Sequence, residues 1–185
     1  MAPLVVLLLF SRPIIDENSF TGIVLTLIGW LIFGLYVTLR IWATLFIGSR
    51  KDRKLQSEGP YSLTRNPLYL GTFCFALSSV LLLKSIALAF VVGLGIVFYS
   101  RFVVKAEERF LAGQFGESFA SYHDRTPRFL PSLSRFHSPD SVHVSLVALK
   151  SEAKRLWTAF LFPVTVGIIM HLRMSPHWPH WFRLP

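Results

Sequence analysis

Four apolar runs dominate this chain, and each is long enough, or nearly long enough, to cross a bilayer. The first extends from Phe20 to Gly48 and is interrupted only by Arg40. A helix needs about 20 residues to cross a hydrocarbon core of roughly 30 Å, so this run predicts a span near 20–40. Beyond it, Arg40 is expected to snorkel to the interface. The other three runs predict spans near 67–83, 86–104 and 156–172.

The composition agrees with a membrane protein. Hydrophobic residues make up 52% of the chain and charged residues only 16%, whereas soluble domains carry about a quarter charged residues. The formal net charge of +9 does not predict a nucleic-acid partner, because the basic residues cluster beside the apolar runs rather than on one face. This positive-inside pattern predicts that segments 49–66 and 105–155 are cytoplasmic.

The order of the spans brings two polar features to one membrane face. Pro67 suits the start of the second span, and Lys84-Ser85 leaves room only for a tight turn before the third. A turn this short forces an antiparallel hairpin. The polar segment 59–71, before the second span, therefore meets Glu107-Glu108, after the third. Charged groups there need partners or a water-filled cavity, so this face is the expected site.

The rest of the chain predicts one membrane domain, residues 1–185. Its short apolar N-terminus predicts an interfacial helix, and the amphipathic pattern after Val104 predicts further interfacial helices. Segment 132–145 is typical of a linker, and an additional helix begins at Leu146 and continues through 146–172. We therefore expect an all-α, polytopic membrane helix bundle of about four transmembrane helices, whose oligomeric state stays open. The His/Trp-rich tail predicts an aromatic belt at the far interface, and no Cys/His spacing indicates a metal site.

The residues at the expected site suit ligand binding. Segment 59–71 offers hydrogen-bonding groups from four side chains: Tyr61, Arg65, Asn66 and Tyr69. Neighbouring helical residues point about 100° apart, so only one of Glu107 and Glu108 is expected to face the interior, and the other to form a surface salt bridge. The plainer alternative is an interfacial loop that Tyr and Arg merely anchor.

Two motifs carry a resemblance to a known family. The run Gly-Pro-Tyr-Ser-Leu-Thr-Arg-Asn-Pro-Leu-Tyr-Leu-Gly is followed, one hairpin later, by Glu-Glu-Arg-Phe and by Thr-Pro-Arg-Phe-Leu-Pro. Residues 59–131 thus resemble the catalytic region of the isoprenylcysteine carboxyl methyltransferases and their phospholipid N-methyltransferase relatives. The resemblance implies S-adenosyl-L-methionine at the cytoplasmic face and a lipophilic acceptor from the bilayer, such as an isoprenylcysteine-like carboxylate, a phospholipid amine or a lipophilic thiol.

The resemblance also implies roles for particular residues. Arg128 and Glu108 are expected to be catalytic, and Arg128 to orient the polar head of the acceptor. The expected cofactor-binding residues are Tyr61, Arg65, Asn66, Pro67, Tyr69, Glu107, Glu108 and Tyr122. This chain has Asn66 where the family usually has His, and an amide cannot act as an acid or base near pH 7. The resemblance, which covers residues 59–131, does not extend to the additional helix after residue 145.

Two alternatives stay open, a rival enzyme and, from a different class, a protein without catalysis. An NADPH-dependent membrane reductase of lipids or sterols carries a similar Arg-His-Pro-x-Tyr-x-Gly motif, but such chains are usually longer and the Glu107-Glu108 pair favours the methyltransferases. A non-catalytic small membrane module is the other. Binding of S-adenosylhomocysteine without binding of NADPH would distinguish methyl transfer from both.

Overall fold

The computed structural model describes residues 15–47 and 55–173, and within these ranges every regular element is helical. The elements are α2 (Phe20–Ile47), α3 (Pro60–Leu63), α4 (Pro67–Leu83), α5 (Ile86–Phe98), the π-helical η1 (Tyr99–Val103), α6 (Val104–Phe115), α7 (Glu117–Arg125), the 3₁₀ turn η2 (Leu133–Arg135) and α8 (Leu146–Arg173). The all-α helix bundle is confirmed. The N-terminal apolar segment, the basic residues of 50–54 and the aromatic tail lie outside the described residues.

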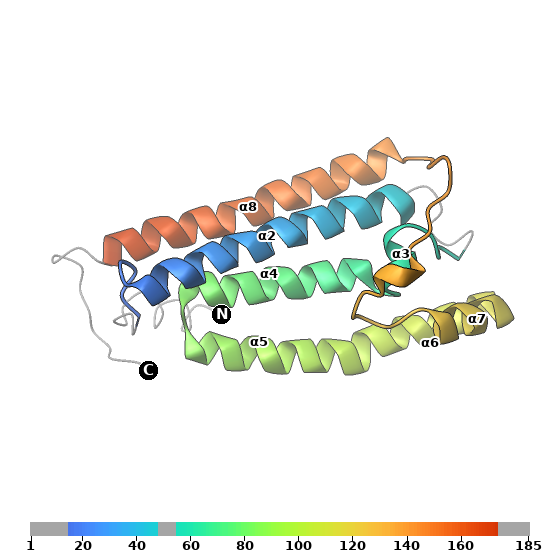
Figure 1. Cartoon of the computed structure of the whole chain (residues 1–185), viewed down its shortest axis with the longest axis horizontal. Helices are drawn as coiled ribbons and strands as arrows, with labels where there is room; N and C mark the ends of the chain where they lie inside the picture. The colour runs from blue at the N-terminus through green and yellow to red at the C-terminus, as the bar shows by residue number, and fades with distance from the viewer. Residues whose placement is uncertain (1–14, 48–54, 174–185) are drawn as a thin grey trace.

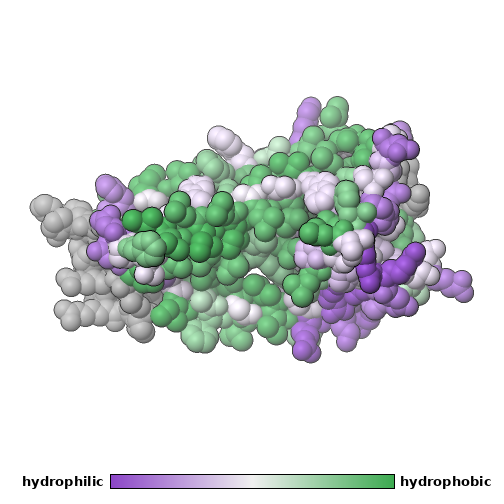
Figure 2. Space-filling view, in the orientation of Figure 1, coloured by the Kyte–Doolittle hydropathy of each residue, from purple (hydrophilic) through white to green (hydrophobic). Residues whose placement is uncertain are grey.

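The long helices run side by side, with the short elements gathered at one end. Figure 1 shows α8, α2, α4 and α5 roughly parallel to one axis, with α3, α6, α7 and η2 together at the same end. Most of the packing lies between α2 and α4, with α8 against both. Hydrophobic residues cover the middle of the molecule, and hydrophilic residues gather mainly at the end that holds α6 and α7 (Figure 2).

Three helical stretches are long and apolar enough to cross a membrane, namely Phe20–Ile47, Leu88–Phe115 and Leu146–Leu172. They confirm three of the four predicted spans, although each helix extends beyond its predicted range. The fourth, Pro67–Leu83, has the predicted bounds but only 17 residues, which is the lower limit for a span. It is tied to the third by the predicted hairpin, in which Lys84 takes a left-handed conformation and Ser85 caps α5. The chain is an integral membrane protein.

Small residues let α2 and α4 approach closely. The Ser78 hydroxyl on α4 donates to the carbonyl oxygen of Gly29 on α2 at 2.9 Å, a contact typical of membrane helix pairs. Nearer the polar end, a Cβ at Gly71 would lie 3.2 Å from the Cγ and Cδ of Arg40. The lack of a side chain at Gly71 therefore leaves space for the aliphatic part of Arg40 between α2 and α4.

A buried ion pair joins α8 to α2, and it corrects the expectation that Arg40 snorkels. The side chain of Arg40 is 11% exposed. Its Nε and Nη2 donate to Glu152 at 2.5 and 2.8 Å, and Arg155 Nη1 donates to the same carboxylate at 2.6 Å. A fork-shaped guanidinium matches a carboxylate in this way. Because Glu152 lies 112 residues away in the sequence, the local pattern around Arg40 could not reveal the pairing.

The third span continues without a break into the polar end. Helix α5 passes through η1 into α6, and the helix ends at Gly116. The φ of Gly116 is 51°, in the left-handed region that glycine adopts without steric strain because it has no Cβ. A π-helical segment of this kind shifts the facing of the residues that follow it and is frequent at functional sites. The uninterrupted helix carries Glu107 and Glu108 to the polar end, where Glu108 meets Arg65 and Asn66 between α3 and α4.

The arrangement predicts a topology that single-cysteine labelling can check. In a Cys74→Ser background, Ser57→Cys and Ser134→Cys should react with an impermeant thiol reagent from the cytoplasmic side, because both lie at the end that holds α3 and η2. Asn18→Cys, at the other end of α2, should react only from the opposite side. Labelling of positions 57 and 134 from opposite sides would contradict this topology.

Candidate functional site

The turn before α4 is built around a glycine that no other residue can replace. Gly59 has φ 60°, and a Cβ there would lie 2.4 Å from ring atoms of Phe46 on α2. Its N–H donates to the carbonyl oxygen of His137 at 2.8 Å. The Ser62 hydroxyl donates to the carbonyl oxygen of Gly59 and accepts from the His137 N–H. The turn of α3 therefore packs closely against α2 at Phe46, and hydrogen bonds to His137 join it to the segment after α7.

One buried carboxylate connects three parts of the site. Glu108 on α6 is 6% exposed. Its Oε1 accepts from Arg65 Nε at 3.1 Å, from Asn66 Nδ2 at 3.2 Å and from Arg128 Nε at 3.2 Å. Its Oε2 accepts from Arg128 Nη2. A buried carboxylate is costly unless it is paired and hydrogen-bonded, and here two guanidinium groups and an amide meet that requirement. We call Glu108, Arg65, Asn66 and Arg128 the Glu108 cluster.

Backbone hydrogen bonds hold the segment that carries Arg128 against the turn before α4. The Arg65 N–H donates to the Pro127 carbonyl oxygen at 2.9 Å, and the Ser132 N–H donates to the Leu63 carbonyl oxygen at 3.1 Å. The Arg128 carbonyl oxygen accepts from the Thr64 hydroxyl at 2.8 Å and from Asn66 Nδ2 at 3.3 Å. The position of Arg128 is therefore set by main-chain contacts as well as by its ion pair.

Two buried tyrosines, Tyr61 on α3 and Tyr122 on α7, lie at the same end of the bundle as this cluster. The Tyr122 hydroxyl on α7 donates to the carbonyl oxygen of Tyr61 at 2.8 Å, which fixes α7 to α3. The hydroxyl of Tyr61 is buried and has no hydrogen-bond partner. Burial raises the pKa of both phenols above the usual value, so both stay protonated and can donate. An unpartnered buried hydroxyl is uncommon, and this one belongs to a ring that packs in a core cluster with Ala43 and Phe46 of α2.

The other carboxylate of the pair faces outward, beside a group of aromatic rings. Glu107 is exposed and accepts a hydrogen bond from the Tyr69 hydroxyl. The Tyr69 ring lies 5.6 Å from that of Tyr99, which lies 6.4 Å from Phe73, and Phe73 lies 5.3 Å from Phe129. These four rings, which we call the aromatic shelf, come from α4, η1 and the segment after α7. A carboxylate beside aromatic faces suits a cationic ligand.

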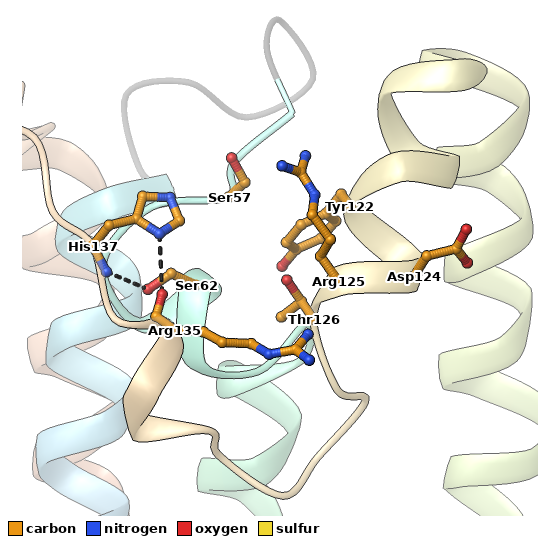
Figure 3. Close-up of a pocket in the computed structure, with 8 residues that line it drawn as sticks. All are labelled: Ser57, Ser62, Tyr122, Asp124, Arg125, Thr126, Arg135 and His137. Carbon is orange, nitrogen blue, oxygen red and sulfur yellow. Dashed lines mark hydrogen bonds between the residues drawn. The ribbon is translucent and has the colours of Figure 1, made fainter.

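A hollow opens on the polar side of α3. It has a volume of about 420 Å³. Figure 3 shows Ser57, Ser62 and His137 on one side facing Tyr122, Arg125 and Thr126 on the other, with the Arg135 side chain reaching across. The hollow is also lined by Asp124, so two guanidinium groups and one carboxylate surround it. No carboxylate among the described residues forms an ion pair with Arg125 or Arg135.

The structure brings the predicted site residues to one end of the bundle but gives them different surroundings. Arg65, Asn66, Glu108 and Arg128 form one cluster, Tyr69 pairs with Glu107, and Tyr122 pairs with the backbone of Tyr61. Pro67 is fully buried as the first residue of α4. The expectation that only one of the two glutamates faces inward is confirmed. The expected surface salt bridge of the other is wrong, since Glu107 contacts the Tyr69 hydroxyl instead and has no ion pair among the described residues.

Sequence reasoning missed the aromatic shelf. Phe73 and Tyr99 lie within apolar runs, where an aromatic residue is ordinary, so no local signal separates them from lipid-facing residues. Phe129 lies within the Arg-Phe-Leu-Pro motif, which did offer a signal. Only the fold, which places η1 beside the first turns of α4, shows that these rings meet next to Glu107.

Comparisons with known proteins agree with the two motifs. The profile of the phospholipid methyltransferase family matches residues 18–118. The chain is 39% identical over 140 residues to the cobalt-zinc-cadmium resistance protein CzcN of Cupriavidus metallidurans, an alignment that covers 75% of this chain and 64% of that protein. It is 34% identical over 131 residues to the nickel-cobalt-cadmium resistance protein NccN of Alcaligenes xylosoxydans xylosoxydans, covering 70% and 61%.

A third relative is a methyltransferase by name. The chain is 30% identical over 81 residues to the protein-S-isoprenylcysteine O-methyltransferase of Schizosaccharomyces pombe, which covers 44% of this chain and 34% of that protein. The chain therefore spans less than two thirds of the length of all three relatives. No solved structure matches it.

The contrast between the two glutamates predicts different effects on stability. Glu108→Gln should lower the free energy of unfolding by about 1–3 kcal/mol, because it leaves two guanidinium groups without their buried carboxylate. Glu107→Gln, on the exposed side of the same helix, should change it by less than about 0.5 kcal/mol. Denaturant unfolding of the two variants in the same detergent provides the measurement. Equal effects would show that Glu108 does not hold the site together.

Proposed function

Because the chain belongs to the phospholipid methyltransferase family, we propose that it transfers a methyl group from S-adenosyl-L-methionine to a lipophilic acceptor at the cytoplasmic membrane face. When bound, this cofactor supplies a methyl group that its sulfonium already activates. The observation that carries the proposal is the exposed Glu107 carboxylate beside the aromatic shelf, at the end of the bundle where the apolar helices meet the polar segments.

The residues present fit such a cofactor by their chemistry. The Glu107 carboxylate suits an ammonium group or a pair of ribose hydroxyls. The faces of Tyr69, Tyr99 and Phe73 suit a flat base or a cationic sulfur, since an aromatic face attracts positive charge.

The Glu108 cluster acts as the support of this site. Glu108 already accepts hydrogen bonds from three side chains, so its part is to fix Arg65, Asn66 and Arg128 in place. Arg128 is the most exposed of these, with 36% of its side chain accessible, and it can turn part of its guanidinium group toward the polar head of an acceptor. Binding groups held in this way lower the entropic cost of aligning two reactants.

The chain's own residues indicate what kind of acceptor suits the site. Asn66 cannot remove a proton, and its amide donates to Glu108 and to the Arg128 carbonyl oxygen. A carboxylate is already ionised near pH 7, so it attacks without losing a proton and needs no base. A thiol has to lose its proton first, because the thiolate is the attacking form. An amine acceptor also loses a proton, and Asn66 supplies no base while Glu107 is assigned to the cofactor. An isoprenylcysteine-like carboxylate therefore suits these residues best, and a lipophilic thiol or a phospholipid amine stays in the proposal with its proton passing to water.

The names of the relatives bear on this proposal in different ways. The Schizosaccharomyces pombe protein is named for methylation of an isoprenylcysteine, which agrees with a lipophilic acceptor. The two bacterial relatives are named for metal resistance, which states a role in the cell and no reaction. We therefore propose methyl transfer as the reaction of this chain, and the identity of the acceptor decides whether it has a part in metal resistance.

A methyl-transfer assay tests the proposal. Purified full-length protein should move a labelled methyl group from S-adenosylmethionine into total membrane lipid or prenylcysteine analogues, with the product identified by mass. Glu107→Gln should weaken S-adenosylhomocysteine binding about tenfold or more, the scale of a lost charged hydrogen bond. Arg128→Lys should lower turnover because Lys cannot form the two-pronged contact. Lys150→Gln, on the first turns of α8, serves as the control with unchanged activity.

Three results would contradict the proposal. The wild-type protein could bind NADPH and not S-adenosylhomocysteine, which would favour the reductase alternative. It could bind neither, which would favour a non-catalytic membrane module. Normal methyl transfer by both Glu107→Gln and Arg128→Lys would remove these two residues from the site.

A further inference from the structure

A second groove lies away from the candidate methyl-transfer site, on the side of the bundle formed by α2, α4 and α8. It has a volume of about 590 Å³. Its aromatic lining comes from all three helices: Tyr36 from α2, Phe75 from α4 and Phe162 from α8. The family match ends at residue 118, so α8 supplies one wall of this groove from outside the matched region.

One end of the groove is positively charged. Lys154 and Arg155 on α8 both line it, and both are exposed. Arg155 shares the Glu152 carboxylate with Arg40, which holds that carboxylate by two contacts. No carboxylate among the described residues pairs with Lys154. Two guanidinium groups share the Glu152 carboxylate and Lys154 has no carboxylate partner among the described residues, so this end of the groove keeps an excess of positive charge.

The charged and aromatic parts follow one another along α8. Lys154 and Phe162 are eight residues apart, which corresponds to about 12 Å along a helix. Because α8 begins at the end of the bundle that holds α3 and η2 (Figure 1), the two cations lie nearer the polar end and Phe162 lies deeper in the apolar stretch. This order matches the shape of an amphiphile, whose charged head stays at the interface while its chain enters the hydrocarbon.

We propose that this groove binds one anionic phospholipid. Lys154 and Arg155 contact the phosphate-containing head, and the acyl chain lies over Phe75 and Phe162. Basic side chains at a membrane surface attract anionic lipids, and the uncompensated charge here selects an anionic head over a zwitterionic one. The lipid covers the seam where α8 meets α2 and α4, so it also stabilises the docking of a helix that lies outside the family match. The site is separate from the Glu108 cluster and does not depend on methyl transfer.

Native mass spectrometry of the full-length protein tests this proposal. The protein is exchanged into detergent with equal amounts of dioleoyl phosphatidylglycerol and dioleoyl phosphatidylcholine, and the retained lipid is counted. The wild-type protein should retain one phosphatidylglycerol with a preference of up to about thirtyfold, the scale expected for two basic residues. Lys154→Gln/Arg155→Gln should lose the preference. Arg125→Gln/Arg135→Gln, which removes the same charge from the hollow beside α3, should keep it.

A second variant separates lipid binding from loss of the Glu152 contact. Thr158 is exposed and lines the groove between its charged and aromatic parts. Thr158→Trp should fill the groove and lower the retention of both lipids, while it leaves Arg155 paired with Glu152. Equal retention of both lipids by the wild-type protein would overturn the proposal. So would an unchanged preference in Lys154→Gln/Arg155→Gln, or unchanged retention in Thr158→Trp.

Discussion

The carboxylate of Glu108 is the interaction on which the polar end of this bundle depends. The turn before α4, helix α6 and the segment after α7 would each carry unpaired polar groups if they stood alone. A single buried anion accepts hydrogen bonds from Arg65, Asn66 and Arg128 and so fixes all three segments. Removing the carboxylate leaves Arg65, which is buried, and Arg128 without their shared anion, so the three segments depend on Glu108 together.

The burial of Glu108 also determines the direction of its neighbour. Because adjacent residues of a helix point about 100° apart, fixing Glu108 inward turns Glu107 outward, toward Tyr69 and the aromatic shelf. One residue thus supplies the support and the next supplies an exposed negative charge. The two glutamates therefore have different roles, although their side chains are chemically the same.

Much of the fold could be predicted because it follows from local physical rules. The length of the apolar runs sets the spans, Pro67 sets the start of α4, and the two residues Lys84-Ser85 set the hairpin. The hairpin in turn places Glu107 and Glu108 beside segment 59–71, so the meeting of these two polar features follows from the order of elements along the chain.

What could not be predicted are contacts between residues far apart in the sequence. Glu108 meets Arg65 across 43 positions and Arg40 meets Glu152 across 112. The sequence near these residues does not indicate that Glu108 rather than Glu107 faces the interior, or that Arg40 pairs with Glu152. The π-helical turn at 99–103 likewise has no breaker residue to mark it, and it brings Tyr99 onto the aromatic shelf.

Hydrogen–deuterium exchange of the full-length protein, with and without S-adenosylhomocysteine, tests the central claim that the cofactor site lies between segment 59–70 and α6. We expect slower exchange on ligand addition in 59–70 and in 104–130, with no change in α8. Protection confined to α8, or no protection in either of the first two segments under saturating ligand, would contradict it.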